Sequence, residues 1–439
     1  MTSFAVERYL GDFAALAPRL PGAALPWLHL ARSRALERFA AEGFPTTRNE
    51  AWKYTNVAAI EKQTFQPALL APAAGVDDIR GWQLEEQVHR LVFVNGRYAP
   101  GLSRVRALPA RALVTNLAEV LARYPHLAEP YLGETPAEGA FAAMNTAFMS
   151  DGAFVQLGEG VAIEEPIHLL FLSTASGTAC HPRNLIVAGE GAAALVVEQY
   201  VGLADSVYLT NALTQIVAGR GARVEHYKVQ QESGKAYHIA GIHAGQGSDS
   251  RFDSHSLSLG ADLARNDIAT RLDGAGCETT LNGLYVVGGR QHVDHHTRID
   301  HAQPKGTSRE FYRGILDGAA RAVFSGRIVV HQDAQHTDAA QSNHNLLLSR
   351  EAEVDTRPQL EIYADDVKCS HGATVGQLDE NMLFYLRARG LDADHARDLL
   401  TYAFASEVLQ RIRIRSLRVR TESLLVARMP GGERLKELI

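Results

Sequence analysis

Apolar residues recur with the spacing of helices near both ends of the chain and alternate as in strands through its middle. Residues 3–42 and 113–149 carry apolar side chains about every third or fourth position, and prolines interrupt the first of these stretches. The same spacing returns after residue 376, where Asp379 is a suitable helix N-cap and Gly390 a suitable helix end. The pattern predicts helical regions on both sides of a β core.

The middle of the chain is a series of short alternating runs separated by turn glycines. Strand formers follow several of these turns, as in the runs 193–200 and 222–229. A coil of such strands cannot bury its own apolar face, whereas coils stacked on one another make a continuous core. We therefore expect a mainly β fold built as a β-helix, with a sandwich of short strands as the alternative. The turns are marked by Gly-x-Gly pairs that recur every 26–31 residues, at Gly158/Gly160, Gly189/Gly191, Gly219/Gly221, Gly245/Gly247 and Gly274/Gly276.

Residues 91–98 predict a β-hairpin ahead of the β core. Asn95-Gly96 stands between strand formers there, which is the strongest short-range signal for a hairpin turn. The later Gly-x-Gly pairs lead into strands, whereas a dinucleotide-binding loop leads into a helix, so they do not indicate a nucleotide site. The expected regions are an N-terminal helical region with a short hairpin (1–150), a β-helix core (151–376) and a C-terminal helical region (377–439).

The composition is that of an ordinary globular protein. The 439 residues are 46% apolar and 21% charged, and a net charge of −6 argues against a nucleic-acid partner. Cys180, Cys277 and Cys369 are widely spaced and odd in number, which indicates a reducing compartment rather than a disulfide framework. The sequence shows no signal-peptide pattern and no run of 18 apolar residues. We expect a soluble, cytoplasmic protein without membrane association.

One segment, residues 367–375, places two metal-binding residue types on the same face of a strand. Side chains alternate between the two faces of a strand, so Cys369 and His371 project to one side with about 6.6 Å between their α-carbons. A thiol and an imidazole could therefore point at one ligand. A lone Cys-x-His pair is also compatible with a cysteine that fills space in a core, since zinc sites usually show four ligands in recognisable pairs. Both interpretations stay open at this point.

Histidines and carboxylates alternate at three further places. His292, Asp294 and His296 would share one strand face, which suits a metal site and equally a polar ladder facing solvent. The same spacing occurs at His331/Asp333 and His336/Asp338.

A catalytic interpretation rests on carboxylates near the end of the β core. β-helix folds host polysaccharide-cleaving enzymes, and Glu361 with Asp365 or Asp366 could form the carboxylate pair that glycoside hydrolysis needs. Nothing in the sequence fixes these groups opposite a substrate, and there is no Gly-x-Ser-x-Gly nucleophile motif. This enzyme class remains an alternative.

Five segments between Phe324 and Leu409 carry a specific likeness to a known family. They are Phe324-Ser325-Gly326, residues 335–343 (Gln-His-Thr-Asp-Ala-Ala-Gln-Ser-Asn), 355–362 (Asp-Thr-Arg-Pro-Gln-Leu-Glu-Ile), 368–374 (Lys-Cys-Ser-His-Gly-Ala-Thr) and 383–390 (Leu-Phe-Tyr-Leu-Arg-Ala-Arg-Gly). Together they closely resemble SufD of the SufB/SufD family, which serves iron–sulfur cluster assembly in the SUF system. A shorter likeness at residues 48–55 includes Trp52 and Tyr54. Gly372 follows His371 where SufB-like sequences typically carry Glu, which favours SufD over a SufB-like paralogue.

The resemblance implies a right-handed parallel β-helix flanked by N- and C-terminal helices. It implies a scaffold subunit without catalytic activity, which pairs with SufB through the β-helix cores. A transient iron–sulfur cluster, or iron, would be shared with SufB at that interface, with His371 as the expected ligand and Cys369 as a weaker one. Thiolate and imidazole suit iron and its clusters. We expect no cofactor bound stably by this chain alone, whereas a reduced flavin could belong to the complex.

The resemblance also implies a docking site for SufC, an ABC-type ATPase, on helices at about residues 379–411. Apolar residues there cover more than one stripe, so the second helix is either buried or a docking surface. The expected contacts are Tyr385, Leu399, Leu400, Tyr402, Phe404 and Val408. A SufB-like pairing surface left unpaired could allow a homodimer. The alternative functions are a SufB-like paralogue and a β-helix carbohydrate-active enzyme.

Overall fold

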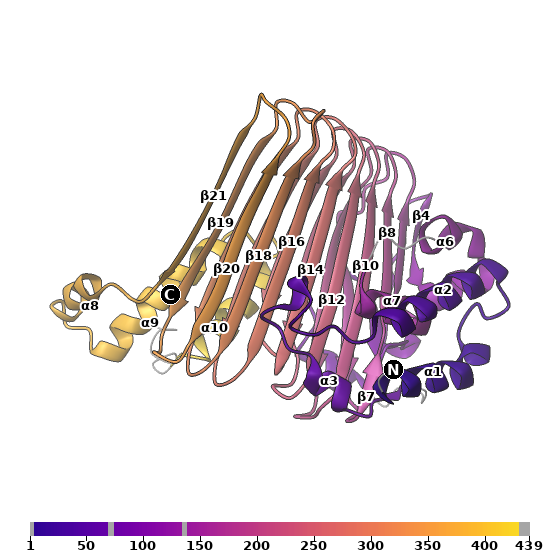
Figure 1. Cartoon of the computed structure of the whole chain (residues 1–439), viewed down its shortest axis with the longest axis horizontal. Helices are drawn as coiled ribbons and strands as arrows, with labels where there is room; N and C mark the ends of the chain where they lie inside the picture. The colour runs from indigo at the N-terminus through magenta and orange to yellow at the C-terminus, as the bar shows by residue number, and fades with distance from the viewer. Residues whose placement is uncertain (1–3, 69–73, 134–137, 430–439) are drawn as a thin grey trace.

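The alternating runs in the middle of the chain form strands that go in turn to two facing sheets (Figure 1). The computed structural model describes residues 4–68, 74–133 and 138–429. One sheet has 11 strands and the other 10, and neighbouring strands in the body of each sheet are parallel. The expected mainly β fold is confirmed, and it is a β-solenoid rather than a sandwich because each coil stacks on the one before it.

The strands are distributed between the sheets as follows. The 11-stranded sheet has the order β20 (Glu353–Ile362), β18 (Arg321–Val330), β16 (His292–His301), β14 (Leu263–Leu272), β12 (Tyr237–Gln246), β10 (Leu209–Ala218), β8 (Arg183–Ala188), β5 (Ala153–Leu157) and β4 (Ala112–Asn116), with β7 (Thr178–Cys180) beside β10 and β1 (Gln66–Pro67) beside β7. The 10-stranded sheet has the order β21 (Lys368–Gly376), β19 (Asp338–Leu347), β17 (Thr307–Leu316), β15 (Glu278–Val287), β13 (Arg251–Ser258), β11 (Arg223–Gln231), β9 (Ala193–Gly202), β6 (Ile167–Ser173), β2 (His89–Val94) and β3 (Arg97–Tyr98).

Equivalent residues of successive coils are stacked in register. Ala193 pairs with Arg223, Arg223 with Arg251, and Arg251 with Glu278, which reproduces the period of the glycine turns. The turns also stack, since the amide of Gly191 donates to Arg220 O at 2.8 Å. Gly191 has φ +63°, a conformation that glycine adopts without a Cβ penalty. The Gly-x-Gly repeat in the sequence is therefore the coil repeat of the structure.

Helices lie at both ends of the chain. The N-terminal ones are α1 (Phe4–Leu16), α2 (Pro26–Glu42), α3 (Ala58–Lys62), α4 (Val76–Arg80), α5 (Leu117–Arg123), α6 (Pro125–Leu132) and α7 (Ala140–Phe148), with short 3-10 turns at Ala17–Arg19, Glu50–Trp52 and Pro100–Leu102. The C-terminal ones are α8 (Glu380–Arg387), α9 (Ala393–Leu409) and α10 (Arg415–Val426).

The two groups of helices cover different outer faces of the solenoid. Phe39 and Phe148 of the N-terminal helices share an apolar cluster with Ile239 of the 11-stranded sheet. Leu409 and Leu417 of the C-terminal helices share another with residues such as Tyr227 of the 10-stranded sheet. Figure 1 shows α1, α2, α6 and α7 near one end of the solenoid and α8 and α9 near the other. A third apolar cluster fills the interior between the sheets.

Most local predictions are confirmed. β2 and β3 form the expected hairpin, with Phe93 opposite Tyr98 and Asn95 in the left-handed region at φ +50°. Asp379 caps α8, because its Oδ1 accepts the amide of Asn381 at 2.7 Å. The prediction of helix from residue 113 is wrong for its first residues, since β4 forms there and pairs antiparallel with β5. Strands β2 and β4 thus join the sheets before residue 151, where we expected the core to begin.

Two tyrosines in the interior fit against glycines of the neighbouring coil. Tyr312 is in register with Gly283, and Tyr285 is in register with Gly314. A Cβ at either glycine would overlap the facing ring. Both rings are fully buried, so the tyrosines and glycines form two complementary pairs across one coil boundary.

We predict that Gly283→Ala destabilises the protein by about 1–3 kcal/mol, because the added methyl overpacks a buried ring. Gly245→Ala is the matched control, since Gly245 also lies in a strand but a Cβ there meets no atom within 4 Å. Thermal or denaturant unfolding of both variants measures the difference. Equal stability of the two variants would contradict the packing described.

Candidate functional site

The solenoid ends at two strands that are each paired on one side. β21 is the last strand of its sheet and pairs with β19, while β20 is the last of the other and pairs with β18. We call the end formed by β20 and β21 the open end; Figure 1 shows it next to α8 and α9. The amide of Lys368 donates to Thr337 O at 2.8 Å, on the β19 side. Since direction alternates along a parallel strand, the N–H groups of Cys369, His371, Ala373 and Val375 point away from β19.

Cys369 and His371 both face the interior side of the terminal coil. Cys369 is in register with buried Ala339 and packs against the apolar core between the sheets. His371 lies two residues further on and is in register with buried Gln341, so it shares this face. His371 is exposed because the solenoid has ended there. The predicted common face is confirmed; ligand binding by either residue stays a prediction.

The two residues differ in their surroundings. Cys369 is half-buried, and this burial raises the pKa of its thiol, with the nearby Asp338 adding to the effect. A raised thiol pKa leaves less thiolate at neutral pH, and the thiolate is the form that binds metal. His371 is exposed, so its imidazole is open to a ligand that a partner brings. His371 is therefore the more accessible of the two side chains.

Glu310 carries a buried carboxyl group one coil before Gln341, the residue in register with His371. Glu310 is in register with Gln341, and Gln341 Nε2 donates to Glu310 Oε2 at 2.5 Å. Burial raises the pKa of Glu310 to about 7, and the hydrogen bond from Gln341 opposes this rise. Inward polar residues thus continue from the open end into the solenoid.

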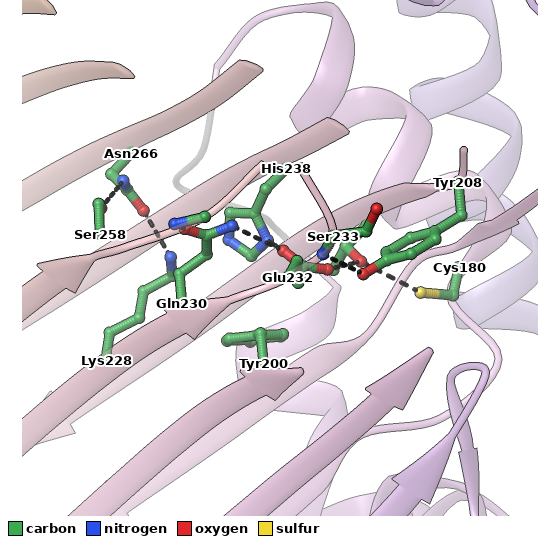
Figure 2. Close-up of polar contacts among 12 residues, drawn as sticks. Cys180, Tyr200, Tyr208, Lys228, Gln230, Glu232, Ser233, His238, Ser258 and Asn266 are labelled. Atoms are coloured by element: carbon green, nitrogen blue, oxygen red, sulfur yellow. Dashed lines mark hydrogen bonds and ion pairs between the residues drawn. The ribbon is translucent and has the colours of Figure 1, made fainter. Parts of the chain in front are cut away.

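A second polar cluster fills the interior several coils away, between β9, β11 and β12 (Figure 2). Glu232 accepts a hydrogen bond from Thr210 at 2.6 Å, and His238 Nδ1 lies 2.6 Å from its other carboxylate oxygen. Lys228 Nζ donates to Asn266 Oδ1 at 2.6 Å and lies 5.3 Å from the centre of the Tyr200 ring. All these groups are buried, so the solenoid carries charge in its interior.

The charges in this cluster compensate one another. Burial lowers the pKa of Lys228 to about 8, while the carboxylates of Glu198 and Glu232 oppose the shift. Burial by itself would raise the pKa of Glu232, but His238 and the hydrogen bonds from Thr210 and Gln230 bring it below its ordinary value. A buried carboxylate with such partners is tolerated, whereas an unpaired one is costly. The arrangement stabilises charge inside the fold.

The sequence-based predictions did not include this cluster, although the sequence holds a signal for it. In the run 193–200, alternation assigns Val196, Glu198 and Tyr200 to the inward face. In the next coil the same face carries Val224 and then the polar residues His226 and Lys228. A charged residue at an inward position of an otherwise apolar series indicates a buried polar group, and two-residue alternation is enough to assign that position.

The face that carries His292, Asp294 and His296 is covered by the N-terminal segment. Asp294 Oδ2 accepts hydrogen bonds from Arg265 at 2.6 Å and from Thr55 at 2.5 Å, and His296 Nε2 lies 3.1 Å from Asp294 Oδ1. Burial raises the pKa of Asp294, but Arg265 and His296 hold it well below its ordinary value. The metal-site interpretation is not supported here, because these contacts form a protein ion-pair network.

The segment with Trp52 and Tyr54 is part of the same contact. The guanidinium of Arg265 lies 3.8 Å from the centre of the Trp52 ring, and Trp52 also packs 5.5 Å from Phe141. Arg357 of β20 donates to Glu50 at 2.8 Å and lies 5.7 Å from the Tyr54 ring. This short segment, which carried a family likeness, thus fixes the N-terminal region onto the outer face of the 11-stranded sheet.

The other histidine and carboxylate pairs are separated in the structure. His336 Nδ1 lies 2.9 Å from Asp366, while Asp338 accepts a hydrogen bond from Arg309 at 2.8 Å. Glu361, considered above as a catalytic carboxylate, accepts from Arg327 at 2.8 Å, and this bond lowers its pKa. The lowered pKa of Glu361 does not favour a general acid of the glycosidase type, which needs a raised one.

The described part of the chain holds neither a ready-made metal cluster nor a helix suited to a bilayer. No three or more His, Cys, Asp or Glu side chains in residues 4–68, 74–133 and 138–429 are grouped so that they could hold a metal ion. None of the helices in these ranges has both the length and the apolar composition needed to span a bilayer.

The residues expected to contact SufC lie on two helices with different exposure. Tyr385 on α8 is 55% exposed, and its neighbour Phe384 is 73% exposed. On α9, Phe404 is half-buried, with the guanidinium of Arg313 4.4 Å from its ring centre. Val408 is fully buried against the 10-stranded sheet and offers no surface to a partner. The remaining expected contacts are half-buried: Leu399, Leu400 and Tyr402.

Comparison with known proteins assigns the chain to a family over nearly all its length. The model of the SufBD core domain of SUF system FeS cluster assembly matches residues 171–404, and the model of the SufBD N-terminal region matches residues 5–169. An iron–sulfur cluster assembly SufBD family protein of Synechocystis is 34% identical, over 90% of this chain and 90% of its own length. The iron–sulfur cluster assembly protein SufD of Escherichia coli is 33% identical over 91% and 92%, and that of Bacillus subtilis 26% identical over 91% and 93%. The chain therefore belongs to the SufBD family of iron–sulfur cluster assembly proteins and is a homologue of SufD.

Proposed function

We propose that this chain is a cytoplasmic scaffold subunit of a SUF complex that pairs with SufB at the open end and carries SufC on its C-terminal helices. It has no catalytic activity of its own and presents His371 to an iron–sulfur cluster or iron that is cargo of the complex. The observation that carries the proposal is the open end itself, where a strand with unpaired backbone groups displays an exposed imidazole.

Unpaired strand edges favour a partner at this end. A row of free N–H and C=O groups is a template for pairing with another chain, and a protein that keeps its edge long and uncovered exposes itself to aggregation. Large apolar side chains are exposed beside the edge: Ile362, Tyr363 and Val375. A SufB solenoid that continued both sheets would satisfy the backbone and cover these side chains. A second copy of this chain could occupy the same edge when SufB is absent.

The ligand chemistry also favours a shared site. Cys369 and His371 supply at most two ligands, whereas iron in a cluster usually takes four, including its bridging sulfides. A site at the junction of two chains needs only one or two ligands from each. We assign no residue of this chain to a flavin.

The SufC-docking surface that we propose is centred on α8. Met382, Phe384 and Tyr385 form an exposed apolar group on a helix that Figure 1 shows projecting beyond the solenoid. Exposed aromatic residues of this kind are typical of the centre of a protein interface. Leu399, Leu400, Tyr402 and Phe404 can contribute only their exposed parts, and Val408 is left out of the surface because it is buried.

We predict that Ala373→Pro weakens association with SufB by about tenfold or more while melting changes little, because proline removes an outward N–H from the open edge. Thr374→Pro is the contrast, since its N–H faces β19 and its loss should lower the melting temperature. Native mass of the co-expressed chains and thermal melting are the measurements. Wild-type association of a folded Ala373→Pro chain would argue against pairing along this edge.

We predict that His371→Ala leaves the complex assembled but lowers cluster formation by roughly tenfold or more, as expected when a ligand is lost. The readout is visible absorbance of the cluster formed on the purified complex. The control is His344→Ala, because His344 lies on neighbouring β19 and its Nδ1 is 2.8 Å from Thr374 Oγ1. An unchanged cluster yield with His371→Ala would remove this residue from the site.

We predict that Phe384→Asp weakens SufC binding by about tenfold or more, because it places a charge in an apolar contact. Folding should be unaffected, since the side chain is 73% exposed. Phe4→Asp is the matched control, an 82% exposed phenylalanine at the other end of the molecule. Calorimetric titration with SufC measures binding. Equal affinity of the two variants would place the docking surface elsewhere.

A further inference from the structure

Gln341 is the buried residue that faces His371 from the preceding coil. The two residues are in register across β19 and β21. Gln341 is 3% exposed and lies on the inward face of β19, whereas His371 on the terminal coil is exposed. Neighbouring strands are about 4.8 Å apart, so side chains in register on one face can approach each other.

The carboxamide of Gln341 is held in one orientation. Its Nε2 donates to Glu310 Oε2 at 2.5 Å, and Glu310 is also 3% exposed. This bond uses an N–H of the Gln341 carboxamide and leaves its carbonyl oxygen free to accept. Its Oε1 is buried and has no hydrogen-bond partner among the described residues. A buried acceptor without a donor is unfavourable, so a hydrogen-bond donor is expected for this oxygen.

Gly326 supplies a second, independent observation. A Cβ at this position of β18 would overlap Gln341 Nε2 and also approach Gln341 Cδ to 2.8 Å. The φ angle of Gly326 is not in the left-handed region, so the backbone conformation does not require glycine there. Space for the Gln341 carboxamide does require it. The Phe324-Ser325-Gly326 segment thus keeps room for the carboxamide of Gln341.

We propose that Gln341 is a positioning residue for His371: its Oε1 accepts one ring N–H and so directs the other ring nitrogen out of the open end. The inference rests on the proposed function, which gives His371 its role as a ligand. A histidine that binds a metal usually donates its second N–H to a carbonyl or carboxylate, and this bond fixes the tautomer and the ring orientation. Gln341, anchored by Glu310, provides such a carbonyl.

The test is nitrogen NMR of the full chain labelled at histidine, with the signals of His371 assigned through His371→Ala. The wild-type ring should populate one neutral tautomer predominantly. Gln341→Met keeps the length of the side chain but removes the acceptor, and should shift the tautomer ratio about fivefold to tenfold toward that of free imidazole. The matched control is Asn343→Leu, because Asn343 is equally buried on the same face of β19 but is in register with Ala373.

Gly326→Ala tests the contact between Gln341 and His371 without substituting Gln341. Its added methyl displaces the Gln341 carboxamide, so we expect the same shift of the tautomer ratio. Thermal melting shows that each variant is folded. An unchanged tautomer ratio in folded Gln341→Met or Gly326→Ala overturns the proposal, as does an equal shift in Asn343→Leu. If His371→Ala leaves cluster formation intact but Gln341→Met shifts the ratio, the proposed function fails and the positioning contact stands. If His371→Ala impairs cluster formation but Gln341→Met leaves the tautomer ratio unchanged, the positioning role of Gln341 is wrong and the proposed function stands.

Discussion

The backbone ladder that runs from coil to coil is the constraint on which the rest of this molecule depends. Each coil shields the interior of its neighbour from water. The burial of a side chain therefore depends on the position of its coil in the stack as much as on residue type. Gln341 and His371 illustrate this, because they are neighbours on one inward face and yet one is buried and the other exposed. Where the ladder ends, a residue that would lie in the interior is presented to solvent.

The interior is not uniformly apolar, and its polar groups follow the same constraint. Glu198 accepts hydrogen bonds from Thr214 and Tyr200, and Glu232 from Thr210, so each carboxylate finds donors on nearby strands. A buried charge without such partners would be strongly unfavourable. Polar residues can therefore be stacked inside the solenoid provided that neighbouring coils satisfy them. Gln341, one coil before the open end, retains an oxygen without a partner among the described residues.

Local patterns in the sequence predicted those features that depend on neighbouring residues. The Gly-x-Gly period is the coil repeat, the Asn95-Gly96 turn is a hairpin, and two-residue alternation places Cys369 and His371 on one face. Alternation cannot show that this face belongs to the last coil, because that depends on where the stack ends. The contacts of Asp294 could not be predicted from local pattern either, because Thr55 and Arg265 bind it from distant parts of the chain. Residues 113–116 were misassigned because pairing with β5 overrides their helical spacing.

The order of elements along the chain links the terminal coil directly to the C-terminal helices. Residues 377–379 alone separate the end of β21 from the start of α8. The next helix is fixed differently, because α9 packs on the 10-stranded sheet through buried residues such as Val408 and Leu409. α8 therefore connects to the sheet through β21, and β21 is held by a single ladder to β19. The strand that displays His371 is thus both a terminal strand of its sheet and the strand that leads directly into the exposed helix.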